Sequence, residues 1–180
     1  SDVVIAHNAS FDENWINNRL AAHGMHPPSP YKVICTLKSL KKYFKLPSNS
    51  LDASTRYFDL AQKRSHDGIG LWLACMQGCE ESMEKLLHYN RGDIPTLEQL
   101  YYKILPFIKN HPNAALYYND DKVRCNTCGA DDMEEITGKY SYTNLSKFKT
   151  FRCNSCGSVK RNRVNERTKE QMKSTLMNTV

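Results

Sequence analysis

Four of the seven cysteines in this chain form two Cys-x-x-Cys pairs, and no other feature limits the fold so strongly. Cys125 and Cys128 make the first pair, and Cys153 and Cys156 make the second after residues 129–152. Zn²⁺ binds four thiolates in a tetrahedron, and a Cys-x-x-Cys turn presents two of them from one tight loop. Four ligands leave no open position for water, so the pattern predicts a structural zinc site in a small ribbon that needs the metal to fold.

Redox chemistry is the alternative use of such pairs, but it needs a thioredoxin-like strand and helix that the flanking residues do not offer. The pairs lie in near-copies of one segment, Val123–Gly129 and Phe151–Gly157. An odd cysteine total with paired spacing favours metal binding in a reducing compartment over a secreted disulfide framework. We therefore expect a cytoplasmic protein. We expect no membrane partner, because no apolar run approaches the ~18 residues of a membrane span.

Positive charge is concentrated in the last third of the chain. Residues 121–180 hold 12 of the 25 Lys and Arg but 7 of the 19 Asp and Glu, so they carry +5 of the overall +6. Such asymmetry predicts a polyanionic partner, and nucleic acid fits better than a membrane because no apolar amphipathic stretch accompanies the charge. A solvated basic tail is the alternative explanation.

Aromatic and basic residues alternate between the two cysteine pairs. Single-stranded nucleic acid is bound by aromatic rings that stack on bases beside cations that contact phosphates. We therefore predict phosphate contacts for Lys147, Lys149 and Arg152; alternatively, the aromatic side chains form the small core of the ribbon. The alternating residues are Lys139, Tyr140, Tyr142, Lys147, Phe148, Lys149, Phe151 and Arg152.

The first part of the chain predicts an α/β domain in which helices dominate. Two short strands are expected, at residues 3–6 and 33–35. Helices are expected at residues 12–23, 37–44, 51–58, 69–77 and 80–108, with Gly92 as a candidate break in the last. Two such strands are too few for a stable sheet under so many helices, so the opening strands of the domain are expected to be absent. The expected organisation is a domain at 1–112, a linker at 113–120, a zinc ribbon at 121–160 and a basic tail at 161–180.

Two carboxylates in this domain occupy positions suited to chemistry. Asp12 follows Asn8 and Phe11 at the junction between a buried strand and the first turn of a helix. The carboxyl end of a strand faces the crevice where α/β folds bind ligands, although an acid there also stabilises the helix dipole. Tyr89 and Asp93 are four residues apart, so on a helix they share one face.

These residues resemble a known family. Asn-x-x-Phe-Asp followed by Tyr-x-x-x-Asp resembles the second and third motifs of the DEDD-type 3'-5' exonucleases of the RNase H-like superfamily, in the Tyr branch. Cys35-Thr36-Leu37 occupies the place of the usual Asp-Thr-Leu, and residues 46–51 resemble the turn into the next helix. Residues 89–113 followed by the zinc ribbon look like phage-type exonucleases related to the proofreading domain of family-B polymerases. The resemblance covers residues 3–165.

The resemblance implies two-metal-ion phosphodiester hydrolysis from a free 3' end, with Mg²⁺ or Mn²⁺ as the catalytic ions. Asp12 and Asp93 would be metal ligands, and Tyr89 would orient the attacking water. Asn8 and Phe11 would shape the junction and the floor beneath the terminal nucleotide. The implied partner is single-stranded DNA, together with replication proteins, and the implied location is the host cytoplasm if the protein is phage-encoded. The residues themselves do not distinguish DNA from RNA.

One family motif is missing. No Asp-x-Glu precedes Asn8, although in the family this motif supplies the other two carboxylates. We therefore expect an N-terminally truncated exonuclease that binds catalytic metal poorly and does not cleave by itself. The alternative is a non-catalytic nucleic-acid-binding module on an RNase H-like scaffold. A third, weaker alternative is a transposase-like ribbon on an unrelated helical domain.

Histidines add two further alternatives. His88 lies five residues before Asp93, which is the spacing of the His branch, in which a histidine is the general base. Adjacent helical residues differ by about 100°, so His88 and Tyr89 cannot both face the metals, and the surrounding residues favour Tyr89. His66-Asp67 would be a second catalytic pair, but a loop and helix cap explains it better.

Overall fold

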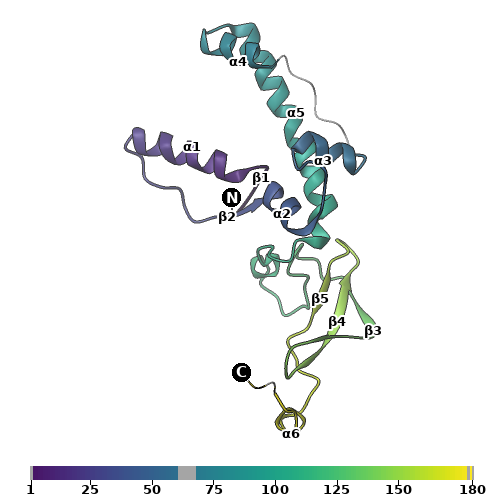
Figure 1. Cartoon of the computed structure of the whole chain (residues 1–180). Helices are drawn as coiled ribbons and strands as arrows, with labels where there is room; N and C mark the ends of the chain where they lie inside the picture. Colours follow the sequence, from purple (N-terminus) through teal and green to yellow (C-terminus); the bar gives the residue numbers. More distant parts are fainter. Residues whose placement is uncertain (1, 61–67, 178, 180) are drawn as a thin grey trace. The chain divides into compact units, whose positions relative to one another are not determined.

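The structure, a computed structural model, describes residues 2–60, 68–177 and 179 (Figure 1). These residues belong to two compact units, Ser1–Ile104 and Leu105–Val180. The histidine and aspartate at positions 66 and 67 lie outside the described residues.

A strand–helix–strand motif opens the first unit. Strand β1 (Val3–Ala6) pairs in parallel with β2 (Lys32–Cys35), and helix α1 (Ala9–Ala22) lies between them in the sequence. Parallel strands need a crossover connection, and a helix is the usual one. The register pairs Val4 with Val33 and Ala6 with Cys35, so the two strands end side by side. Both strands and the helix confirm the expectation from the sequence to within three residues.

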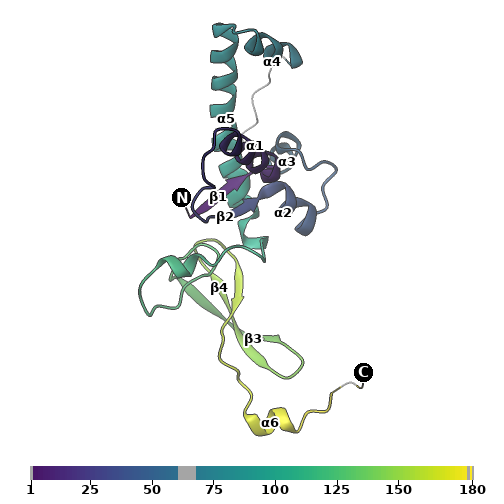
Figure 2. The same ribbon diagram turned by 90° about the vertical axis from the view of Figure 1, so that its left-hand side faces the viewer.

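Four further helices complete the first unit. They are α2 (Thr36–Tyr43), α3 (Leu51–Tyr57), α4 (Ile69–Met76) and α5 (Glu80–Ile104). Helices α2 and α3 pack against α5, and α4 lies beside the first turns of α5 in both views (Figures 1 and 2). The most deeply buried apolar side chains are Leu40 on α2 and Leu100 and Ile104 on α5, each fully shielded from solvent.

Helix α5 does not break at Gly92. It runs without interruption from Glu80 to Ile104, with both Gly92 and Pro95 inside it. Thr96 is buried, and its hydroxyl donates a hydrogen bond of 3.0 Å to the Gly92 carbonyl. A glycine lowers helix stability by about 1 kcal/mol relative to alanine, and a buried face on a long helix offsets such a penalty.

The fold class is therefore mixed α/β in the first unit, with a small parallel sheet. Within the described residues each of its strands has one neighbour, in agreement with the expectation of a sheet with two strands visible. No helix in the described parts of the chain combines the length and the apolar character that crossing a membrane requires.

The second unit is built on an antiparallel sheet. Two short 3-10 helices, η1 (Leu105–Phe107) and η2 (Ala114–Tyr117), precede the strands β3 (Met133–Tyr142), β4 (Lys147–Cys153) and β5 (Val159–Arg161). The strand order is β3-β4-β5, so β4 is central (Figure 1). The register between β3 and β4 shifts between Glu135 and Tyr140, where Gly138 has a φ of 74°. This irregularity lets β3 carry extra residues opposite β4.

The chain beyond β5 stays attached to the sheet. The Asn162 amide donates to the Lys149 carbonyl at 3.0 Å, and the Glu166 amide donates to the Lys147 carbonyl at 2.8 Å. Residues 162–166 therefore continue along β4 past the end of β5. Helix α6 (Lys169–Lys173) follows, and a capping box between Thr168 and Gln171 fixes its first turn.

Candidate functional site

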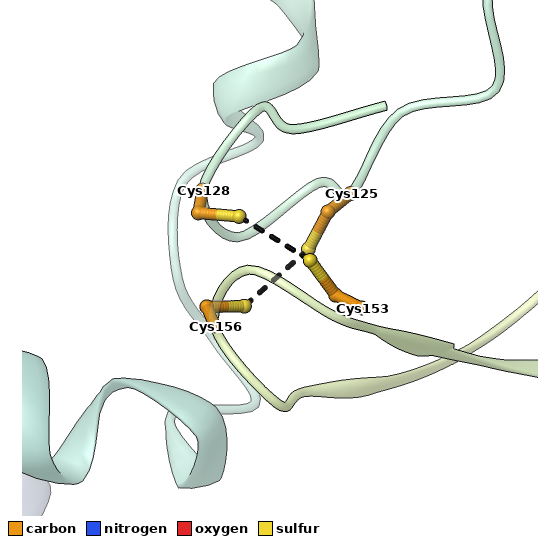
Figure 3. Close-up of side chains that lie close together, drawn as sticks. All are labelled: Cys125, Cys128, Cys153 and Cys156. Atoms are coloured by element: carbon orange, nitrogen blue, oxygen red, sulfur yellow. Dashed lines mark hydrogen bonds between the residues drawn. The ribbon is translucent and has the colours of Figure 1, made fainter. Parts of the chain in front are cut away.

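The four paired cysteines come together in the second unit. Cys125 and Cys128 lie in the turn before β3, Cys153 is the last residue of β4, and Cys156 lies in the turn between β4 and β5. Their side chains point toward one another from the two loops (Figure 3). All four sulfur atoms lie within 4.8 Å of one another, and none belongs to a disulfide. The cluster predicted from the sequence is therefore present and can hold a metal ion.

The sulfur spacing fits a tetrahedral metal. The Sγ atoms of Cys125 and Cys156 are 3.7 Å apart, and those of Cys128 and Cys153 are 3.6 Å apart. A Zn–S bond of about 2.3 Å makes the edge of a regular tetrahedron about 3.8 Å long. A disulfide bond would need about 2.05 Å. The cluster thus has the dimensions of a four-thiolate metal site.

The two loops share one backbone design. The amide of Gly129 donates to the Cys125 carbonyl, and the amide of Gly157 donates to the Cys153 carbonyl, both at 2.8 Å. Both glycines have a positive φ, 81° and 78°. At Gly129 a side chain would also collide with the ring of Tyr118, because an added Cβ would lie 2.4 Å from a ring carbon. The glycine after each pair is therefore a requirement of the turn.

An arginine closes each loop. Arg124 Nη1 donates to the Gly129 carbonyl at 2.8 Å, and Arg152 Nη1 donates to the Gly157 carbonyl at 3.2 Å. Arg124 also forms an ion pair with Asp120 and stacks on the Tyr118 ring, 4.0 Å from its centroid. The Arg124 hydrogen bond holds the pKa of the Asp120 carboxyl below its usual value. The sequence repeat contains both arginines, but it does not reveal this use of them.

Ser158 makes the two halves of the cluster unequal. Its hydroxyl is buried and lies 3.3 Å from Cys125 Sγ and 3.1 Å from Cys156 Sγ. Ala130 occupies the matching position in the first loop. Burial raises the pKa of the Cys125 thiol, but hydrogen bonds from Ser158 and from the amides of Cys128 and Thr127 outweigh this effect, so its pKa falls to about 6. Burial dominates at Cys128, and the pKa of that thiol rises to about 12.

In the first unit, Asp12 and Asp93 line the same pocket. The pocket has a volume of about 280 Å³ and lies at the carboxyl end of β1. Asp12 comes from the first turn of α1 and Asp93 from the middle of α5, so the fold brings together two carboxylates far apart in the sequence. The remaining lining residues are Ile5, Ala6, His7, Leu51, Ile94 and Leu97.

The other predicted residues of this site lie around the pocket or away from it. Tyr89 is buried one helical turn before Asp93, whereas His88 is exposed, so Tyr89 lies on the packed side of α5. Asn8 is the N-cap of α1 and has a left-handed backbone, with φ 68° and ψ 43°. Phe11 is 60% exposed and its ring contacts Trp15. Asn8, Phe11 and Tyr89 are not among the described residues that line the pocket.

A hydrogen-bond link that the sequence did not reveal fixes one wall of this pocket. Thr36 is fully buried at the start of α2, and its hydroxyl donates to the Ala6 carbonyl at 3.2 Å. His7 Nδ1 lies 2.9 Å from the same hydroxyl. Because the hydroxyl gives its one proton to Ala6, His7 Nδ1 is the donor in this contact. The link ties the end of β1 to the start of α2.

The predicted substrate-binding residues of the ribbon divide between two faces of the sheet. Side chains alternate along a strand, so Lys147 and Lys149 share one face of β4 and Arg152 lies on the other. The antiparallel register places Tyr142 opposite Lys147 and Tyr140 opposite Lys149. It also places Lys160 of β5 opposite Phe151, on the face of the two lysines. The sequence does not indicate a role for Lys160, because the three residues of β5 are too few to recognise as a strand.

Two charges on this face are already partnered. Lys149 Nζ lies 3.1 Å from Glu135 Oε2, and this hydrogen bond raises the pKa of the lysine. Lys147 Nζ lies 3.7 Å from the centroid of the Tyr140 ring.

The four cysteines are the metal-binding group that the described residues contain. Within residues 2–60, 68–177 and 179, they alone bring three or more His, Cys, Asp or Glu side chains close together. Asp12 and Asp93 do not form such a group.

Comparison of the chain with protein-family models, with curated proteins and with solved structures found no match in any of the three.

Proposed function

We propose that the chain is part of a metal-dependent 3'-5' exonuclease that acts on single-stranded DNA, with a zinc ribbon attached to an RNase H-like domain. The observation that carries this proposal is the pocket shared by Asp12 and Asp93. These two residues come from separate motifs, and nothing in the local sequence requires them to meet. Their meeting at the carboxyl end of a parallel strand, where α/β folds bind ligands, supports the motif resemblance.

Several residues in and around the pocket have a role in this proposal. Asp12 and Asp93 would hold Mg²⁺ or Mn²⁺, which supplies activation of water and stabilises charge on the attacking and leaving oxygens. Tyr89 orients water through its hydroxyl, and its place on the packed side of α5 favours it over His88. Thr36 and His7 keep the β1 terminus in position. Asn8 sets the turn that aims Asp12.

Two carboxylates are too few for two-metal hydrolysis, in which each ion needs several oxygen ligands. We propose that an Asp-x-Glu strand outside this sequence supplies the others by pairing with the small parallel sheet. The 180-residue chain by itself is then expected to bind nucleic acid without cleaving it.

The ribbon is proposed to be a structural zinc site. Sulfur separations of 3.6 and 3.7 Å support zinc, and four thiolates leave no position for a reacting water. Cysteines that form no disulfide are typical of a reducing compartment, so the cytoplasm is the proposed location. Metal content of the purified protein, measured by mass spectrometry, is expected to be one zinc per chain, and loss of one cysteine by Cys153→Ser is expected to abolish it.

Digestion of 5'-labelled single-stranded DNA in Mn²⁺ tests the exonuclease proposal. Two proteins are compared: the 180-residue chain, and the chain extended with the Asp-x-Glu strand from its own coding sequence. We expect the extended protein to give a ladder of products shortened from the 3' end, and the 180-residue chain to give none. Asp93→Asn removes a metal ligand and is expected to lower the rate by about a thousandfold, since a bound ion supplies several kcal/mol of transition-state stabilisation.

Glu98→Gln is the matched control, because Glu98 is exposed on the same helix and does not line the pocket. Tyr89→Phe removes one hydroxyl and is expected to slow trimming more than His88→Ala does. An extended protein that carries the strand and binds DNA but does not trim it would overturn the exonuclease proposal. The result would favour the second candidate, a non-catalytic nucleic-acid-binding module, for which the +5 charge of residues 121–180 is the supporting observation.

A further inference from the structure

One face of the β3-β4-β5 sheet collects the aromatic and basic side chains of the ribbon. We call it the platform face and define it by Tyr140, Tyr142, Lys147, Lys149, Phe151 and Lys160. Directly opposed residues in an antiparallel pair lie on the same side of a sheet. The register opposes Tyr142 to Lys147, Tyr140 to Lys149, and Phe151 to Lys160. Three strands therefore contribute to this one surface.

The aromatic side chains of the ribbon do not all serve the same purpose. Phe148 lies on the opposite face, is 9% exposed, and is covered by the Arg161 guanidinium 3.9 Å from its ring centroid. Tyr142 is 68% exposed on the platform face. Phe148 therefore belongs to the packed side of the ribbon, whereas the ring of Tyr142 is open to a ligand.

The rings of Tyr140 and Tyr142 form a neighbouring pair with centroids 6.4 Å apart. Lys147 covers Tyr140 and stands directly across from Tyr142 in the register. An ammonium group beside an open aromatic ring is the arrangement by which proteins bind the base and the phosphate of one nucleotide together.

We propose that the platform face binds single-stranded nucleic acid, with a base stacked on Tyr142 and phosphates contacted by Lys147 and Lys160. The choice of nucleic acid as the ligand rests on the proposed function. An unpaired base presents a free aromatic face to Tyr142, whereas in a duplex neighbouring base pairs cover that face. Arg152, on the other side of the sheet, has no part in this surface.

The ion pair between Lys149 and Glu135 provides a second test of nucleic-acid binding by the platform face. Lys149 is held by Glu135, so its positive charge is largely compensated at the surface. Glu135→Gln releases Lys149 and removes a negative charge that repels phosphate. This variant is therefore expected to bind more tightly than the wild type, in contrast to most surface changes.

Fluorescence anisotropy of the full chain, purified with its zinc, tests the proposal with labelled 15-nucleotide dT and rU strands and a 15-base-pair duplex. An Asp93→Asn background and the absence of added Mg²⁺ or Mn²⁺ prevent cleavage. We expect Tyr142→Ala to weaken single-strand binding about 5- to 150-fold, and Tyr142→Phe to change it little, because stacking needs the ring and not the hydroxyl. The two single strands distinguish DNA from RNA as the preferred source of the same chemistry.

Salt dependence separates stacking from charge. The double variant Lys147→Gln/Lys160→Gln is expected to reduce the slope of log affinity against log salt by about 1.4, and Tyr142→Ala is expected to leave that slope unchanged. Tyr102→Ala is the matched control, since Tyr102 is 60% exposed on α5 in the other unit. Equal zinc content in all variants shows that the ribbon is folded.

Unchanged binding by Tyr142→Ala, or a duplex bound as tightly as the single strands, would overturn the platform. Such a failure leaves the exonuclease test unaffected, because that test reads trimming by the extended protein. Conversely, a platform that binds while the extended protein does not trim supports the surface and contradicts the nuclease.

Discussion

Asn8 lies at the turn that joins β1 to α1. Its backbone lies in the left-handed region at the step from β1 into α1, and its side chain makes no capping hydrogen bond. Asparagine tolerates this conformation better than most residues, and glycine adopts it without strain. The position of Asp12, one turn into α1, depends on this single turn.

Asn8→Ala is expected to lower the free energy of unfolding by about 1 kcal/mol, because alanine pays the full steric penalty of the left-handed region. Asn8→Gly is expected to be no less stable than the wild type. Urea denaturation followed by circular dichroism measures both. Asn14→Ala on the exposed face of α1 serves as control and should be neutral or slightly stabilising, since alanine is the better helix former. Equal losses for alanine and glycine at position 8 would show that the side chain, and not the backbone, matters.

Local spacing explains why some residues could be predicted and others could not. The cysteine cluster follows from two short turns, whose ligands are set by neighbours in the sequence. The contact of Ser158 with two sulfurs and the link from Thr36 to Ala6 depend instead on how separate loops and strands meet. A serine or threonine carries no sign in the sequence that its hydroxyl will be buried in such a contact.

At the scale of elements, α5 contributes both to the candidate site and to the core of the first unit. It presents Tyr89 and Asp93 from its middle and buries Leu100 and Ile104 near its end. Apolar periodicity predicts this helix well. Gly92 predicts a break that does not occur, because tertiary packing overrides the intrinsic preference of one residue.

Leu100→Ala is expected to destabilise the chain by about 2–5 kcal/mol, because it removes a fully buried side chain and leaves a cavity. Leu87→Ala is the matched control on the same helix, where the side chain is 50% exposed, and should cost less than about 1 kcal/mol. Thermal and urea unfolding of both variants measure the difference. Comparable losses would mean that the exposed side of α5 is covered in solution.

Strand β5 shows the opposite limit of sequence analysis. Its three residues, Val159–Arg161, have too short a pattern to indicate a strand, so the sequence places them at the border of a ribbon and a tail. Pairing with β4 makes them strand, and places Lys160 on the platform face. Both β1 and β2 could be recognised from the sequence. The parallel register between them could not, because it depends on how segments far apart in the chain meet.

At the scale of the whole molecule, each of the two units is stabilised in a different way. The first has an apolar core on α2, α3 and α5, whereas the second is organised around four cysteines. Chelation of zinc is therefore expected to unfold residues 105–177 and to leave residues 2–60 and 68–104 folded. Hydrogen exchange mapped by mass spectrometry, with and without a chelator, measures this. Equal exchange gains in both units would contradict it.

Acid should act in the same direction as the chelator. Protons compete with zinc for the four thiolates, so a fall in pH weakens metal binding and with it the folding of the second unit. Burial, with the charge of Lys160 adding to it, lowers the pKa of His111, so protonating this residue as pH falls also opposes folding of the second unit. Zinc release measured with a colorimetric chelator is expected to rise as pH falls. His111→Asn, which removes the second contribution, should shift unfolding more than zinc release.

The outer edges of the parallel pair β1–β2 can pair with a further strand. Within the described residues each of these four-residue strands pairs with one neighbouring strand, so each has an outer edge that faces away from the pair. Such an edge accepts any extended segment that reaches it. In concentrated solutions of the chain, we therefore expect self-association to begin at these edges of the first unit.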